Sequence, residues 1–242
     1  MITTIHNKQI KQIMKLKKNA RERRKQQLFL VEGIRMFTEI TEQYLYKVYA
    51  SEDFYKEHQA VFEGMEVELV SDQVMKEISD TMTPQGVLAL VRMLEYSLED
   101  LLQQENPLLL VLENLQDPGN LGTILRTGEG AGINGIIMSR ETVDIYNPKV
   151  TRYTMGSIFR VPFVYVDDLF EVIKMMKDRN ITTYAAHLNG TDYTRESYTS
   201  GTAFLIGNEG NGLTDELTDN AQKKIKIQMC GRVESLNAAM AS

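Results

Sequence analysis

The sequence has little cysteine, little histidine and no long apolar run, and each shortage excludes a class of protein. A single cysteine, Cys230, rules out an intramolecular disulfide and fits a reducing compartment. The three histidines, His6, His58 and His187, are scattered without zinc-ligand spacing, so we expect no metal. No apolar stretch approaches the ~20 residues of a membrane helix, and the N-terminus lacks the apolar core of a secretory signal. We therefore expect a cytoplasmic protein without a membrane segment.

Positive charge is concentrated near the N-terminus, although the 242 residues carry a net charge of −6. Between Lys8 and Lys25, nine of eighteen residues are Lys or Arg, and only Glu22 is acidic. An apolar stripe at helical spacing accompanies them: Ile10, Ile13, Met14 and Leu16. The pattern predicts one basic amphipathic helix. Such a helix is either a solvated face or a surface for a phosphate backbone or anionic lipid.

Apolar and β-branched runs divide the chain into two α/β parts. The first part, residues 1–95, contains the strand patterns "LFLVEG", "YKVYAS", "VELVS" and "VLALVRM". A polar stretch over residues 96–106, ended by Pro107, is the expected linker. In residues 107–242 strand and helix patterns alternate regularly, from "LLLVLEN" to "KIKIQM". This alternation predicts a parallel sheet covered by helices on both faces.

The segment "GAGING" at residues 130–135 matches the glycine pattern of dinucleotide-binding proteins. That pattern binds a pyrophosphate only where a strand enters it and a helix leaves it. Here the predicted order is reversed, because a helix precedes the glycines and the strand "GIIMS" follows them. We expect Gly132 to cap the helix in a left-handed conformation and Gly135 to begin the strand. A Rossmann oxidoreductase is thereby disfavoured.

Three loops at the ends of predicted strands carry unusual polar residues. "ENLQDPGNLGTILRT" places Asn120 at an expected helix N-cap and Arg126 further along the same helix. "LIGNEGNGL" holds one carboxylate, Glu209, among three glycines. "IKIQMCGRVESLNAAMAS" ends in Ser235 and Asn237, either of which can cap the last helix. The carboxyl ends of parallel strands are where ligands bind, so these loops are the candidate site.

In this order and spacing, the three loops resemble the signature motifs of the SpoU (TrmH-like) family of RNA ribose 2′-O-methyltransferases, within the SPOUT superfamily. "FLVEG-R" and "TPQGVLALV" in the first part are similar to the substrate-binding domain that often precedes this fold, itself akin to ribosomal-protein-like RNA-binding folds. The resemblance implies a parallel sheet whose C-terminal segment forms a deep trefoil knot. It also implies a homodimer through the knotted domain, by way of the last helix and the helix after "PGNLG".

The resemblance further implies S-adenosylmethionine as cofactor, bound in the knot. The expected contacts are Gly207, Ile227, Met229 and Leu236. Glycines in all three loops fit this role, since backbone groups can approach adenine only where side chains do not block them. The family usually has Pro where Gln228 stands here, a change that removes no reacting group.

The expected catalytic residues are Arg126, Asn120, Glu209, Ser235 and Asn237. Arginine stays protonated, so we expect Arg126 to clamp the target phosphate and stabilise developing alkoxide charge, with the other four as orienting hydrogen-bond partners. The expected RNA-binding residues lie on the basic helix: Lys15, Lys17, Lys18, Arg21, Arg23 and Arg24.

The leading hypothesis is a methyltransferase acting on a ribose 2′-hydroxyl of structured RNA, with 23S ribosomal RNA favoured by the separate N-terminal domain. One alternative is an RNA-binding module that has lost catalysis. Another is a methyltransferase directed to transfer RNA. Cofactor binding separates the classes, because S-adenosylmethionine should stabilise an enzyme and do little for a binding module.

Overall fold

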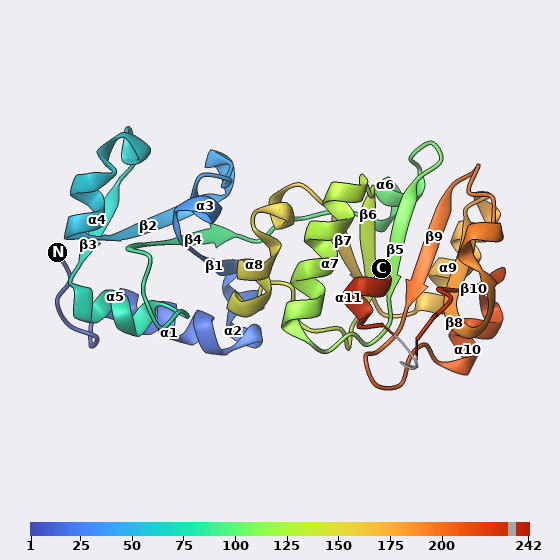
Figure 1. Ribbon diagram of the computed structural model, residues 1–242. Helices are drawn as coiled ribbons and strands as arrows, with labels where there is room; N and C mark the ends of the chain where they lie inside the picture. Colours follow the sequence, from blue (N-terminus) through green and yellow to red (C-terminus); the bar gives the residue numbers. More distant parts are fainter. Residues whose placement is uncertain (232–235) are drawn as a thin grey trace. The chain divides into compact units, whose positions relative to one another are not determined.

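A computed structural model describes residues 1–231 and 236–242 and divides the chain into two compact units (Figure 1). The first unit comprises Met1–Glu95 with Asp144–Phe159, and the second comprises Tyr96–Val143 with Arg160–Ser242. None of the described helices is long and apolar enough to cross a membrane. The described residues also contain no cluster of three or more His, Cys, Asp or Glu arranged to hold a metal ion.

The first unit is built on a four-stranded mixed sheet in the order β1-β4-β2-β3. Its strands are β1 (Leu28–Glu32), β2 (Leu45–Ser51), β3 (Val67–Val70) and β4 (Val87–Arg92). Only β2 and β3 pair in parallel. The helices are α1 (Lys8–Lys18), α2 (Ala20–Gln26), α3 (Ile34–Phe37), α4 (Glu52–Glu57), α5 (Asp72–Ile78) and α8 (Pro148–Thr154), with short 3-10 turns at Glu42–Tyr44, Gln59–Phe62 and Ser157–Phe159. The apolar stripe of α1 packs with α5 and the sheet in one core.

The basic N-terminal segment forms two helices, so the expectation of one continuous helix is wrong. Asn19 separates α1 from α2 with an extended backbone, at φ −133° and ψ 112°. Its side chain accepts hydrogen bonds from the N–H groups of Arg21 and Glu22, as an N-cap residue does. The cap therefore starts a second helix in place of prolonging the first.

The second unit is built on the predicted parallel sheet, with six strands in the order β10-β8-β9-β5-β6-β7. The strands are β5 (Leu108–Leu112), β6 (Gly135–Ser139), β7 (Phe163–Val166), β8 (Thr182–Asp192), β9 (Thr202–Ile206) and β10 (Lys223–Lys226). The helices are α6 (Leu98–Leu102), α7 (Pro118–Ala131), α9 (Leu169–Asp178), α10 (Asp215–Asn220) and α11 (Ala238–Ala241), with a 3-10 turn at Tyr193–Arg195.

Helices cover both faces of this sheet, as Figure 1 shows for α7 and α9. Leu109 and Leu205 belong to the core formed with α9 and α10. On α7, Leu121 and Ile124 are fully buried. Since β5 and β9 are adjacent and parallel, the loops that follow them emerge at the same edge of the sheet.

The glycines of "GAGING" end a helix, as predicted. Gly132 is the C-cap of α7 in the left-handed region, at φ 77°. Gly135 begins β6, where an added Cβ would lie 2.4 Å from a Leu101 methyl carbon. No helix begins in this segment, so it is not a pyrophosphate-binding turn. The trefoil knot stays a prediction, since residues 232–235 of the C-terminal segment lie outside the described residues.

Candidate functional site

Helix α7 begins at the end of the first signature loop and fixes the position of Asn120. The N-cap is Asp117, whose side chain accepts a 2.8 Å hydrogen bond from the Asn120 N–H, and Pro118 occupies the first turn. The expectation that Asn120 caps the helix is therefore wrong. The cap at Asp117 leaves the Asn120 side chain available for other contacts, and the residue is only 9% exposed.

Glu209, from the loop after β9, reaches the N-terminus of α7. One carboxylate oxygen accepts from the Asp117 N–H at 2.9 Å and from Asn120 Nδ2 at 3.0 Å. The other accepts from the Gln116 N–H at 3.1 Å. A carboxylate is favoured at this position because the first N–H groups of a helix have no partner within the helix. The second loop is thereby joined to the first.

Asn237 adds the third loop to this arrangement. Its Nδ2 donates to Asn120 Oδ1 at 2.9 Å, while its Oδ1 accepts from the Ala239 N–H and caps α11, so Asn237 is the cap among the two alternatives predicted. We call Asn120, Glu209 and Asn237 the three-loop cluster. Ser235, the remaining predicted polar residue, lies outside the described residues.

The charge of Glu209 is stabilised by its surroundings. Burial raises the pKa of this carboxyl, but the hydrogen bonds from Asn120, Asp117 and Gln116 outweigh burial and lower the pKa below its usual value. Glu209 is consequently ionised at neutral pH and acts as a hydrogen-bond acceptor only. Its role in the cluster is to hold donors in place.

Arg126 is exposed on α7, six residues beyond Asn120 and so about 9 Å further along the helix axis. Within residues 1–231 and 236–242, its guanidinium makes no hydrogen bond or ion pair. The members of the three-loop cluster already satisfy one another. Arg126 is therefore the predicted catalytic side chain whose charge remains available to a ligand.

The loop after β9 forms a tight turn around Gly207. Asn208 and Gly212 exchange two backbone hydrogen bonds, at 3.0 and 2.9 Å. An added Cβ on Gly207 would lie 2.0 Å from the carbonyl carbon of Gly212, so only glycine fits there. This predicted cofactor residue is thus the point where two backbone segments meet.

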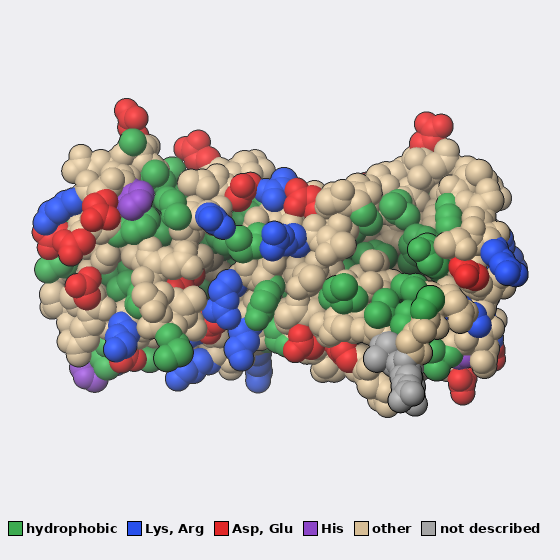
Figure 2. All heavy atoms as spheres, in the orientation of Figure 1, with side chains coloured by type: hydrophobic (Ala, Val, Ile, Leu, Met, Phe, Trp, Pro, Cys, Tyr) green, Lys and Arg blue, Asp and Glu red, His purple; other side chains and the backbone are tan. Residues whose placement is uncertain are grey.

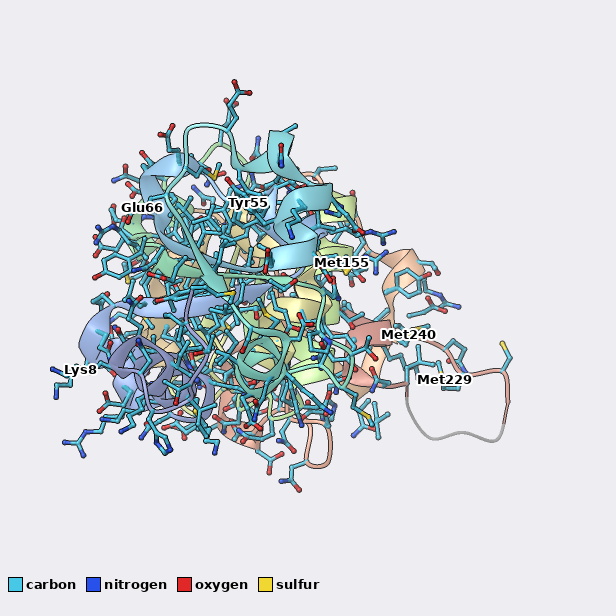
Figure 3. All side chains as sticks on the ribbon, turned by 90° about the vertical axis from the view of Figure 1, so that its left-hand side faces the viewer. Lys8, Tyr55, Glu66, Met155, Met229 and Met240 are labelled. Atoms are coloured by element: carbon cyan, nitrogen blue, oxygen red, sulfur yellow. The ribbon has the colours of Figure 1, made fainter. Side chains whose placement is uncertain are left out.

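The other predicted cofactor residues lie beyond β10. Ile227 and Leu236 are each 38% exposed, and Met229 is partly buried. Figure 3 labels Met229 and Met240, which both lie at the surface near the end of the chain. Leu236 directly precedes Asn237 and is therefore adjacent to the three-loop cluster. These apolar side chains are accessible to a ligand.

Two of the six predicted RNA-binding cations are engaged inside the first unit. Arg23 is 3% exposed, pairs with Asp144 at 2.6 Å and donates to the Leu16 carbonyl near the end of α1. Lys17 donates to the Ser79 carbonyl beyond α5. Because Arg23 is buried, we leave it out of the proposed RNA surface.

The remaining four predicted cations are exposed: Lys15, Lys18, Arg21 and Arg24. Lys15 and Lys18 line a groove at the junction of α1 and α2, together with Met14, Asn19 and Glu22. Figure 2 shows Lys and Arg side chains gathered over α2. The break at Asn19 thus gives the basic segment a concave surface that one straight helix would lack.

Two residues outside the predicted site hold the second loop. Asn208 donates from Nδ2 to the Asn114 carbonyl at 2.9 Å. Glu113, 7% exposed at the end of β5, accepts two hydrogen bonds from Thr214. The position of Asn208 within "GNEGNG" was a usable signal, since Asn favours turns. Glu113 had no comparable signal.

The family of this chain is shown by a match that spans most of the second unit. Residues 107–242, more than half of the chain, match the SpoU rRNA Methylase family. The protein belongs to this family. Residues 7–89 match the MRM3-like substrate binding domain, which is a separate domain family. The resemblance seen in the three signature loops is confirmed.

Individual SpoU family members are similar over the whole chain. The 23S rRNA (guanosine(2553)-2'-O)-methyltransferase RlmP of Bacillus subtilis is 29% identical, with 100% of this chain and 95% of that protein covered. A crystal structure of an AdoMet-bound rRNA methyltransferase from Sinorhizobium meliloti has a TM-score of 0.88 at 30% identity, covering 99% of this chain and 93% of that one. AviRb from Streptomyces viridochromogenes in complex with AdoMet gives 0.88 at 26% identity, covering 98% and 94%.

Proposed function

We propose that the protein transfers a methyl group from S-adenosylmethionine to a ribose 2′-hydroxyl of 23S ribosomal RNA. The observation that carries this proposal is the convergence of the three signature loops. Asn120, Glu209 and Asn237 come from positions up to 117 residues apart and are joined by side-chain hydrogen bonds of 2.9–3.0 Å. Such a preorganised cluster suits a reaction in which alignment supplies most of the rate.

The surroundings of Gly207 fit S-adenosylmethionine as the cofactor. Gly207 packs against the Gly212 backbone with no room for a side chain, so the Gly207–Leu213 turn is a compact backbone cradle at the place where the family resemblance puts adenine. The exposed apolar side chains of Ile227 and Leu236 can cover an aromatic ring. When bound, S-adenosylmethionine supplies an electrophilic methyl group on sulfur. Two neighbours, from Sinorhizobium meliloti and Streptomyces viridochromogenes, are complexes with AdoMet.

We propose that Arg126 acts on the RNA substrate and not on the cofactor. Its guanidinium is permanently charged and can form two parallel hydrogen bonds with a phosphate, which would place the neighbouring 2′-hydroxyl. The same charge stabilises the oxygen as its proton leaves. Asn120, Glu209 and Asn237 hold the three loops together near the start of the helix that carries Arg126. The proton departs through phosphate or water, because none of these side chains is a suitable base.

Two observations favour ribosomal RNA as the substrate class. RlmP, similar over the whole chain, is named as a 23S rRNA 2'-O-methyltransferase. The first unit carries the exposed cations Lys15, Lys18, Arg21 and Arg24, which suit a phosphate backbone. We propose that this surface binds the RNA while the second unit modifies it.

Ligand titration and methyl incorporation together test the proposed function. S-adenosylmethionine should raise the melting temperature in a concentration-dependent way, whereas NADH and FAD should not. Tritium from the labelled methyl group should then enter 23S rRNA. Binding of S-adenosylmethionine without incorporation into any RNA would favour a binding module, and incorporation into tRNA alone would redirect the substrate assignment.

Replacing both Lys15 and Lys18 with Ala should lower the affinity for RNA and make that affinity depend less on salt concentration. Removing one lysine–phosphate interaction lowers the log–log salt slope by roughly 0.9 for duplex and 0.7 for single strands. We expect a slope reduced by roughly 1–2 units, measured by fluorescence anisotropy over a salt series. The matched control replaces Lys174 and Lys177, which are exposed on α9. An unchanged slope in the Lys15/Lys18 variant would remove the α1–α2 groove from the RNA surface.

We also propose that the protein forms a homodimer through α7 and α11. Helix α11 packs beside α7. It presents Met240, which is 71% exposed, near the exposed Leu236. Figure 2 shows hydrophobic side chains at the surface around α11. A self-complementary apolar patch of this kind suits a two-fold pair.

Met240→Glu should convert this dimer into a monomer, because it places a charge in an apolar interface. Sedimentation velocity at micromolar concentration should show a dimer for the wild type and a monomer for the variant. The control is Met82→Glu, since Met82 is 97% exposed in the first unit. A wild-type protein that sediments as a monomer would refute the proposal.

A further inference from the structure

Glu113 is a buried carboxylate that takes no part in the three-loop cluster. It follows β5 directly, and its N–H donates to the Ile206 carbonyl at 2.9 Å, continuing the pairing with β9. The residue is only 7% exposed. A carboxyl group in such a place needs specific hydrogen-bond partners, since a buried polar group without them is costly. Its partners therefore indicate what it does.

Both carboxylate oxygens of Glu113 are used by a single residue, Thr214. The Thr214 N–H donates to Oε2 at 2.7 Å, and the Thr214 hydroxyl donates to Oε1 at 2.8 Å. The same hydroxyl accepts from the Leu217 N–H at 3.2 Å and caps α10. Glu113 thus fixes the end of the second loop and the start of α10 together.

The second loop is held at both ends by this arrangement. Its first end continues β9 and is tied through Asn208 to the Asn114 carbonyl. Its second end is tied through Thr214 to Glu113. Between these ends the backbone of Gly207 closes against that of Gly212, leaving no room for a Cβ on Gly207. The loop geometry is therefore set by neighbouring residues at the end of β5.

Two carboxylates, Glu113 and Glu209, link the two loops by accepting hydrogen bonds in opposite directions. Glu209 of the second loop accepts the N–H groups of Gln116 and Asp117 in the first loop. Glu113, just before the first loop, accepts the N–H and hydroxyl of Thr214 after the second. Each loop thus supplies the acceptor for the other's donors. Loss of Glu209 would leave the first loop without these hydrogen bonds, and loss of Glu113 would do the same for the end of the second loop.

We infer that Glu113 is a positioning residue for the cofactor, acting through Thr214 on the Gly207–Leu213 turn. This inference rests on the proposed function, because that turn is the proposed S-adenosylmethionine cradle. Glu113 does not touch the reacting atoms. It keeps the backbone segments at Gly207 and Gly212 in contact. The distance between these segments sets the shape of the turn and therefore its affinity for S-adenosylmethionine.

Calorimetric titration with S-adenosylmethionine tests the inference. Glu113→Gln cannot accept both Thr214 donors, and Thr214→Val lacks the hydroxyl, so each should raise the Kd about tenfold, the loss expected when one hydrogen bond to a charged group is removed. Their effects should not add in the double variant, because both remove one interaction. Thr214→Ser keeps both donors and should restore most of the affinity. RNA affinity should stay within about twofold in every variant, a split that the loss of overall folding would not produce.

The matched control is Glu216→Gln, since Glu216 is an exposed carboxylate on α10. A lower melting temperature for Glu113→Gln with an unchanged Kd would overturn the inference and leave Glu113 as a stability residue. If the wild type bound no S-adenosylmethionine, the proposed function itself would fail. Amide hydrogen exchange would then test whether Glu113 holds Thr214 in place. Faster exchange of the Thr214 amide in Glu113→Gln would support this role, and unchanged exchange would contradict it.

Discussion

Arg126→Ala should abolish methyl transfer while leaving S-adenosylmethionine affinity within a few-fold of the wild type. Its charge has no partner among the described residues and is assigned to RNA phosphate and the developing oxyanion. Removal of one such donor typically costs about 10²–10³ in rate, and here phosphate alignment is lost as well. Single-turnover methylation of rRNA, with calorimetry for the cofactor, measures the two effects separately.

The lysine variant sharpens this expectation. Arg126→Lys keeps the charge but not the two-pronged geometry, so it should also fail. Arg140→Ala is the matched control, because Arg140 is an exposed arginine of the same unit whose ion pair is with Asp167. Near-normal turnover in either Arg126 variant would remove this residue from the site.

Gly207→Ala should strongly weaken S-adenosylmethionine binding. The new methyl group would lie 2.0 Å from the Gly212 carbonyl carbon and 2.1 Å from the Leu213 nitrogen, so the turn has to open. Overpacking of this kind commonly costs roughly 1–3 kcal/mol. Because the clash is with backbone, we expect a cost near the top of this range, an affinity about a hundredfold weaker, equivalent to roughly 2.8 kcal/mol.

Gly210→Ala provides the comparison within the same loop. An added Cβ there has the Asn208 side-chain oxygen at 3.5 Å as its nearest neighbour, which is an ordinary contact. This variant should bind S-adenosylmethionine within about twofold of the wild type and retain its circular dichroism spectrum. Equal binding by both alanine variants would show that the Gly207 turn is not the cofactor cradle.

Much of the fold can be predicted from the sequence, because its helices and strands depend on local patterns. Apolar runs identified the strands of both sheets, and the glycines after α7 were correctly placed at a helix end. The two local errors have local causes. Pro favours the first helical position, so Asp117-Pro118 was a stronger start signal than Asn120. Asn19 is a strong N-cap residue and starts α2.

The candidate site was predictable in its residues but not in its contacts. Asn120, Glu209 and Asn237 follow from the motifs, yet their mutual hydrogen bonds depend on how separate strands are placed side by side. Arg23 looks like any other surface cation until Asp144, 121 residues later, becomes its partner. Charge composition indicates where cations are concentrated. Only packing shows which of them remain exposed.

Glu113 illustrates the same limit more strongly. Nothing local distinguishes it from an acidic residue at a strand end, and its partner Thr214 lies 101 residues away. Long-range pairs of this kind are specified by the sheet order β9-β5, which brings the two loops together. Residues that position a site are therefore harder to predict than residues within its motifs.

The central claim is methyl transfer to a ribose hydroxyl, and nucleoside analysis of the product tests it most directly. 23S rRNA is incubated with the protein and isotopically labelled S-adenosylmethionine, digested to nucleosides and separated by mass. We predict that the label is found on the ribose of one 2′-O-methylated nucleoside and is absent when Arg126→Ala replaces the wild type. Label on a base, or no label in RNA despite bound S-adenosylmethionine, would contradict this account.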